Sequence, residues 1–67
     1  MAKILLNGEP RLVNDGLSVR ALLDSTEYAQ RRIAVEINRE IVPRSQHAER
    51  LLNDGDRVEI VQAMGGG

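Results

Sequence analysis

Two segments of the chain place large aliphatic residues at alternate positions, and this alternation limits the possible folds more than any other feature. Residues 33–38 carry an apolar side chain at every second position, and residues 57–62 begin in the same way. A period of two predicts half-buried β-strands. Residues 2–7 predict a further strand, in which Leu5 faces away from its apolar neighbours. The chain is therefore expected to be built around a sheet.

Turn residues divide the remaining chain into short elements. Asn7-Gly8 indicates a hairpin turn, because both residue types tolerate positive φ. A second strand is expected at residues 10–13. Pro10 lacks a backbone donor, which suits the start of a strand or the edge of a sheet. Residues 14–16 predict the next turn.

A helix is predicted to start after Ser18. The Ser18 hydroxyl can accept a hydrogen bond from a free amide one turn into the helix. Leu17 and Leu22 are spaced for a hydrophobic staple across that start. Val19, Leu22 and Leu23 share one face at helical spacing. The helix is expected to end near residues 24–26.

The second half of the chain contains shorter signals. Residues 27–32 predict a polar loop, and residues 40–42 a short extended piece that Pro43 ends, since proline removes a ladder hydrogen bond. Residues 45–52 can hold one or two helical turns that place Leu51 or Leu52 on the core. Residues 53–56 predict a turn into the last strand.

These elements predict an α+β fold in which a mixed sheet of four to five strands packs on one main helix. The first and last strands are expected to lie adjacent and parallel at the sheet centre, which is the β-grasp arrangement of ubiquitin-like proteins. The chain has 67 residues and no cysteine, so an aliphatic core must stabilise it without disulfides.

The sequence ends in Gly65-Gly66-Gly67, which a folded core would gain little from ordering. A tail without Cβ atoms can enter a narrow channel and carry the Gly67 carboxylate to a reactive centre. We expect a β-grasp domain at residues 1–63 and a flexible tail at residues 64–67. Fully extended, four residues reach roughly 13 Å.

No catalytic or metal-binding constellation can be defended from the residues. His47 has no partner at ligand spacing and is expected to be a polar residue at the surface or at a helix end. Residues 54–56 resemble a calcium loop but lack its later glutamate, so a solvated turn is expected. The net charge of −1 and the single aromatic residue argue against nucleic-acid binding. No apolar run is long enough for a membrane span or signal peptide, so a cytosolic protein is expected.

The sheet face opposite the helix is a candidate docking surface. Leu5, Val61 and Ala63 are expected to share this face, and Met64 follows them towards the tail. Ordering four tail residues costs on the order of 4–8 kcal/mol, so a partner must also hold the folded body. The alternative is ordinary packing of this face under residues 45–52.

The sequence resembles the ThiS family, the bacterial sulfur carriers of thiamin thiazole synthesis. The resemblance lies in the run from Val35 to Asn38, the run from Glu40 to Arg44, and the run from Gly55 to Ile60 followed by the terminal glycines. It covers essentially the whole chain. The family pattern requires only two terminal glycines, so the pair corresponds to Gly66-Gly67, and Gly65 is extra slack.

The resemblance implies a carrier rather than an enzyme. A ThiF-like partner would use ATP and magnesium to adenylate the Gly67 carboxylate, and sulfur from a partner's cysteine persulfide would replace AMP. The resulting thiocarboxylate would give its sulfur to a thiazole synthase similar to ThiG. Gly66 would give steric access, and no permanently bound cofactor, metal, nucleic acid or membrane is implied.

Three alternatives remain at this point. A carrier similar to MoaD would deliver sulfur to molybdopterin instead of thiazole. A ubiquitin-like modifier would form adducts with lysines of other proteins. A β-grasp interaction module would tolerate loss of the glycines.

Overall fold

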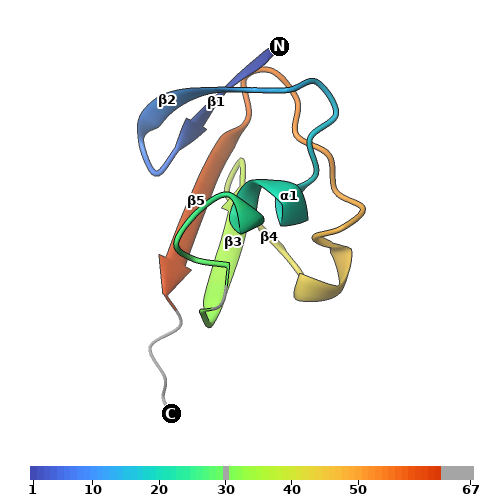
Figure 1. Ribbon diagram of the computed structural model, residues 1–67. Coiled ribbons are helices and arrows are strands. Elements are labelled where there is room, and N and C mark those ends of the chain that lie inside the picture. Colours follow the sequence, from blue (N-terminus) through green and yellow to red (C-terminus); the bar gives the residue numbers. More distant parts are fainter. Residues whose placement is uncertain (30, 63–67) are drawn as a thin grey trace.

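The computed structural model describes residues 1–29 and 31–62, and in this part of the chain a short helix packs against a five-stranded sheet (Figure 1). Every predicted strand is present, with boundaries within one residue of those expected. The elements in chain order are β1 (Ala2–Leu6), β2 (Glu9–Val13), α1 (Val19–Asp24), β3 (Ile33–Ile37), β4 (Glu40–Val42), the 3₁₀ helix η1 (Arg44–Gln46) and β5 (Arg57–Gln62).

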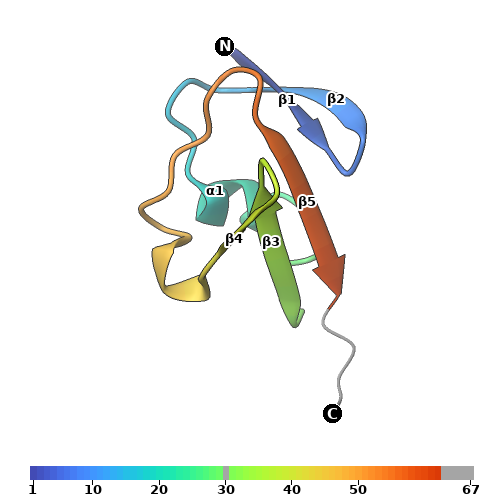
Figure 2. The same ribbon diagram turned by 180° about the vertical axis from the view of Figure 1, so that it is seen from behind.

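The sheet has the strand order β2-β1-β5-β3-β4, which places the last strand at its centre. β1 and β5 run parallel, and the other neighbouring strands pair antiparallel. Figure 2 shows β5 between the β1–β2 hairpin and the β3–β4 hairpin. The predicted parallel pairing of the first and last strands is confirmed. β2 is an edge strand, so the missing donor of Pro10 breaks no interior ladder.

Helix α1 covers one face of the sheet, and the core lies between them. Inward positions of the strands alternate with exposed ones, as the period of two predicted. Leu6, Leu17, Tyr28 and Ile33 are half-buried around the core. The buried apolar residues are Ala2, Ile4, Val13, Val19, Leu22, Leu23, Val35, Ile37, Val42, Leu52, Val58 and Ile60.

Both hairpins turn through two residues with positive φ. Asn7 and Gly8 have φ values of 50° and 86°, and Asn38 and Arg39 have φ values of 52° and 71°. Such turns match the right-handed twist of the strands they join. The Asn7 side chain also accepts a hydrogen bond from the Ile60 amide at 2.8 Å, which ties the first turn to the central strand.

The helix begins as the sequence predicted. Ser18 is extended (φ −81°, ψ 159°), and its hydroxyl oxygen accepts a hydrogen bond from the Ala21 amide at 3.0 Å. The helix ends at Asp24, where the Ser25 amide donates to the Leu22 and Leu23 carbonyls. The cap matters because a helix of six residues has little stability of its own.

We therefore expect Ser18→Ala to destabilise the domain by about 1 kcal/mol. For a domain of this size, that loss lowers Tm by roughly 4–8 °C. Thermal unfolding followed by circular dichroism measures the shift, and Ser18→Asp, which keeps an acceptor, should retain most of the stability. An unchanged Tm in Ser18→Ala would contradict the capping role.

The expectation that His47 is a surface residue is wrong. His47 is the residue directly after η1, which agrees with the alternative that it lies at a helix end. However, it is only 5% exposed. Its Nε2 lies 3.0 Å from the Val42 carbonyl oxygen, and its own carbonyl accepts from the Arg20 amide at 2.9 Å. His47 therefore joins the end of β4 to helix α1, and it is a structural residue.

The segment after β4 contains less helix than predicted. A single 3₁₀ helix forms at Arg44–Gln46, followed by turns. Of the two leucines expected to reach the core, Leu52 is buried at 2% exposure, whereas Leu51 is 48% exposed. The Leu52 amide donates to the Leu17 carbonyl at 2.8 Å, which fixes the choice between the two.

The turn before β5 is more ordered than a solvated turn. Asp56 is only 6% exposed, and its carboxylate accepts from the Asn53 amide at 2.8 Å and from Asn38 Nδ2 at 3.0 Å. The Asp54 carboxylate accepts from the Lys3 amide at 2.7 Å. These carboxylates fasten β1 and the β3–β4 turn to the start of β5, so the expectation of a merely solvated turn is wrong.

Candidate functional site

The carboxyl end of β5 is held on the sheet by its neighbour β3. Gln62 pairs with Ile33, and Val61 pairs with Ala34. At its other end, β5 pairs with β1 through Val58 and Leu6. Figure 1 shows β5 running to the end of the molecule opposite the N-terminus. The central strand is therefore held by its neighbour as far as its last residue, Gln62.

The proposed reactive terminus follows β5 in the sequence. Gly65, Gly66 and Gly67, together with Ala63 and Met64 from the docking hypothesis, lie outside the described residues. The predicted boundary between domain and tail lies there as well. What the structure provides is the anchor at Gln62, and the roles of these five residues stay predictions.

Leu5 and Val61 both face away from helix α1, as expected, but they are not neighbours. Val61 is 48% exposed, and Leu5 is half-buried. Leu5 pairs with Arg57, which is four residues before Val61 on β5. At about 3.3 Å per residue, the two positions are roughly 13 Å apart along the strand. Residues 44–52 do not cover this face at Val61, because that side chain is 48% exposed. The alternative that the face packs under residues 45–52 is therefore disfavoured at this position.

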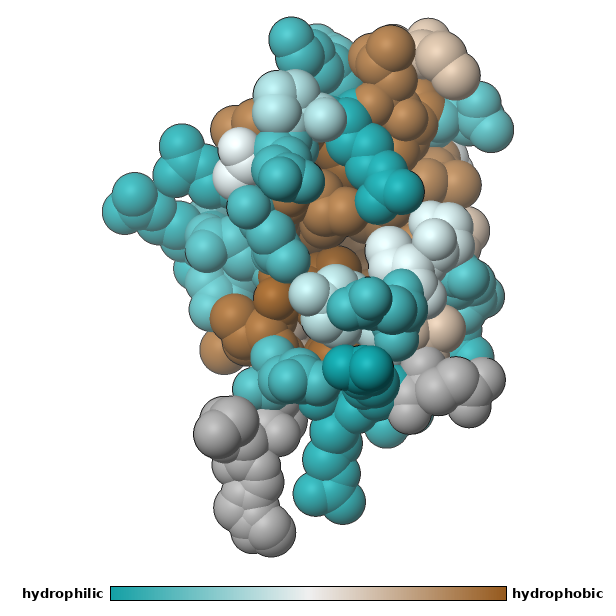
Figure 3. Space-filling view, turned by 60° about the vertical axis from the view of Figure 1, so that its left-hand side comes forward, coloured by the Kyte–Doolittle hydropathy of each residue, from teal (hydrophilic) through white to brown (hydrophobic). Residues whose placement is uncertain are grey.

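Further apolar residues lie on the same face and were not predicted. Leu12 on β2 is 65% exposed, Ile41 on β4 is 70% exposed, and half-buried Ala34 pairs with Val61. The register of each strand places them opposite the core side. Leu12 and Ile41 could have been predicted from the alternation of inward and outward positions along β2 and β4. Figure 3 shows hydrophobic and hydrophilic surface interleaved on the side of the molecule that it brings forward.

Two carboxylates lie in the middle of this face. Glu36 on β3 and Glu59 on β5 are directly opposite each other in the antiparallel register. Like charges at such positions destabilise a sheet. Ile41 pairs with Glu36 on the other side. The face therefore combines exposed apolar residues with an acidic centre.

The buried polar side chains of the described residues have structural roles, and no metal-holding cluster is found among these residues. Within residues 1–29 and 31–62, no group of three or more His, Asp or Glu residues is placed to hold a metal ion. The buried polar side chains, His47 and Asp56, are both engaged by backbone partners. In the same part of the chain, no helix combines the length and apolarity that a membrane crossing needs. Cytosolic location stays a prediction.

The parallel pairing of β1 with a central β5, the two flanking hairpins and the single helix define a ubiquitin-like β-grasp protein. The chain belongs to the ThiS family, whose model matches residues 4–67.

Relatives with the same extent support this membership. The chain is 35% identical to the sulfur carrier protein ThiS of Escherichia coli over 65 residues, which is 97% of this chain and 98% of the relative. A crystal structure of the thiamine biosynthesis protein ThiS from Geobacter metallireducens superposes with a TM-score of 0.84 at 35% identity, covering 97% of this chain and 99% of that one.

Another relative is much longer than this chain. The thiazole synthase of Paramagnetospirillum magneticum is 46% identical over 65 residues, which is 97% of this chain but 20% of the relative. The chain therefore spans about a fifth of the length of that thiazole synthase. In that protein, a ThiS-like segment belongs to the same polypeptide as a thiazole synthase.

Proposed function

We propose that this protein carries sulfur for thiazole formation in thiamin biosynthesis as a thiocarboxylate on Gly67. The observation that carries the proposal is the match of the ThiS family model through residue 67, on a chain whose central strand ends at Gln62, five residues before it in the sequence. Gly67 carries the carboxylate that reacts. Gly66 gives steric access, because it has no side chain and can pass through a narrow channel.

Family membership confirms that the protein is a carrier and no enzyme itself. The chemistry must then come from partners, because a carboxylate is a poor electrophile. A ThiF-like enzyme uses ATP and magnesium to form an acyl adenylate on the Gly67 carboxylate, and pyrophosphate is released. Hydrosulfide displaces AMP directly to give the thiocarboxylate. A cysteine persulfide displaces AMP to give an acyl disulfide, which a second thiol then reduces.

Thiazole synthase is the proposed acceptor of the sulfur. The relative in which a ThiS-like segment shares a chain with a thiazole synthase supports this partnership, because fusion keeps two cooperating proteins at high effective concentration. The match to the ThiS family favours this acceptor over the molybdopterin alternative.

We further propose that the adenylating enzyme docks on the sheet face opposite α1, beside the tail. Val61 is the strongest candidate, because it is half exposed one residue before the end of β5. Ala63 and Met64 continue from it in the sequence. Leu5 contacts the same partner at the far end of the face, beside Arg57 and Glu59.

The test is the intact mass of the protein after incubation with ATP, magnesium, sulfide and a ThiF-like enzyme. We expect one terminal oxygen to be replaced by sulfur, and a variant lacking Gly66-Gly67 to stay unchanged. An unchanged mass with an enzyme that loads another carrier in parallel would refute the proposal. Addition of the loaded protein to thiazole synthase then tests the acceptor.

A further inference from the structure

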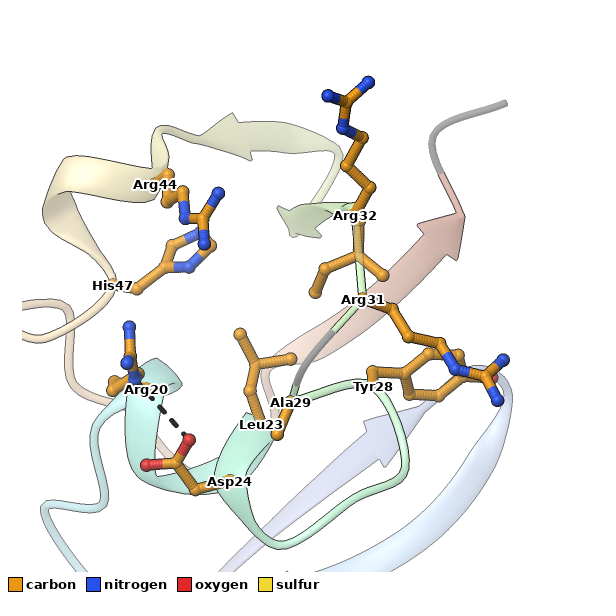
Figure 4. Close-up of a pocket in the computed structure, with 10 residues that line it drawn as sticks. Arg20, Leu23, Asp24, Tyr28, Ala29, Arg31, Arg32, Arg44 and His47 are labelled. Atoms are coloured by element: carbon orange, nitrogen blue, oxygen red, sulfur yellow. Dashed lines mark ion pairs between the residues drawn. The ribbon is translucent and has the colours of Figure 1, made fainter. Parts of the chain in front are cut away.

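A small cavity between α1, the loop after it and η1 is surrounded by arginines (Figure 4). It has a volume of about 60 Å³, and Leu23 and Ile33 form part of its apolar lining. Four of the nine basic residues of the chain line it, against one carboxylate, that of Asp24. The other side chains of the protein then contain five basic against nine acidic residues. The positive charge is therefore concentrated here; the four arginines are Arg20, Arg31, Arg32 and Arg44.

Most of this charge is not neutralised by carboxylates of the residues that the structure describes. In the part of the chain that the structure describes, the one ion pair of the cavity joins Arg20 to Asp24 at 3.5 Å. Arg31, Arg32 and Arg44 are exposed and are not paired with a carboxylate among those residues. Exposed guanidinium groups in this state are available to an acidic partner.

The arrangement of the guanidinium groups suits an extended surface better than a single ion. In Figure 4, Arg44 lies beside His47 on the η1 side, whereas Arg31 lies on the opposite side, by Tyr28. Arg32 extends away from the cavity. These groups do not converge on one point, and a cavity of about 60 Å³ is too small for a nucleotide.

The arginine cluster lies at the end of the molecule from which the terminus leaves. Ile33 lines the cavity and pairs with Gln62, the last residue of β5. An enzyme that takes up the terminus must therefore approach this end. An arginine side chain is much shorter than the roughly 13 Å that four extended residues span. In a complex with the proposed adenylating enzyme, the arginines are therefore expected to contact the entrance of the channel that takes up the terminus.

We propose that Arg31, Arg32 and Arg44 form a second docking surface, which binds acidic side chains at the rim of the channel of the adenylating enzyme. This inference rests on the proposed function. It places one contact surface on each side of the sheet, with the terminus between them. Charge pairs at such a rim mainly raise the rate of productive encounter.

The test compares charge reversals in the steady-state kinetics of loading, with this protein as the varied substrate. Arg31→Glu combined with Arg44→Glu should lower kcat/KM at least tenfold at low salt, leave kcat nearly unchanged, and flatten the dependence of kcat/KM on ionic strength. Arg11→Glu, on edge strand β2, makes the same type of change far from the cavity and should alter kcat/KM less than twofold. Thermal unfolding verifies that each variant is folded.

The inference is overturned if the single variants Arg31→Glu, Arg44→Glu and Arg11→Glu have equal kcat/KM. It is also overturned if the kcat/KM of the wild type does not depend on ionic strength. A second set of results would also overturn the inference. If the isolated carrier binds inorganic phosphate or ATP saturably, if the double variant loses this binding, and if the kcat/KM of the double variant equals that of Arg11→Glu, the cluster is a small-anion site. Failure of the wild type to gain sulfur refutes the proposed function instead, so the two failures are distinguishable.

Discussion

A protein extended by one alanine after Gly67 is expected to gain no sulfur at all, although it should unfold at the same temperature as the wild type. One added residue moves the terminal carboxylate by up to about 3.3–3.6 Å. Reacting atoms must approach within roughly 3–3.5 Å, so the shift is as large as the whole reacting distance. The added Cβ also enters a channel shaped for glycine. Intact mass after the loading reaction measures the result.

Deletion of Gly65 is the matched control for the tail, because it also changes the length by one residue but keeps a terminal glycine pair. If Gly65 is extra slack, this variant loads, with a reduced rate at most. Normal loading of the alanine-extended protein would exclude Gly67 as the reacting residue. Loss of loading in both variants would show that the tail length itself is fixed by the partner.

Val61→Asp is expected to lower kcat/KM for loading by roughly 30-fold or more. We expect Val61 to be one of the few contacts that dominate the binding energy; the loss of such a contact costs about 2 kcal/mol or more, and each 1.4 kcal/mol is a factor of ten. The aspartate would also have to leave water when the partner binds. Because Val61 is 48% exposed in the free protein, the fold should tolerate the change. Kinetics of loading at varied carrier concentration measure the effect.

Leu12→Asp provides the matched control for this face. Leu12 is 65% exposed on edge strand β2, on the same face of the sheet but remote from the end of β5. Both substitutions introduce aspartate into a strand, so they carry a similar cost in β-propensity. A reduction in kcat/KM that is equal in the two variants would show that Val61 has no special part in docking.

The sheet could be predicted from the sequence because its signals are local. Large aliphatic residues at alternate positions of β3 and β5, together with glycine or asparagine in the turns, indicate where the strands lie. The helix start could be predicted from Ser18 and from the helical spacing of the leucines around it. Even the parallel pairing of β1 and β5 followed, because few sheet topologies accommodate one helix between two hairpins.

The errors occurred where burial depends on residues distant in the sequence. His47 is buried because β4 and α1 close around it, and no periodic pattern surrounds it. Asp56 is buried because Asn38, 18 residues away, donates to it. The segment between η1 and β5 has no period, so the sequence could not decide between Leu51 and Leu52. The arginine cluster is likewise assembled from three separate segments.

The central position of β5 has a consequence for the synthesis of the protein. The strand that joins the two hairpins comes last in the sequence, so neither hairpin gains its central partner until residue 62 has been added and has left the ribosome. Proteins dominated by such distant pairings fold late and comparatively slowly. A chain interrupted before β5 therefore lacks the strand that holds the two hairpins together.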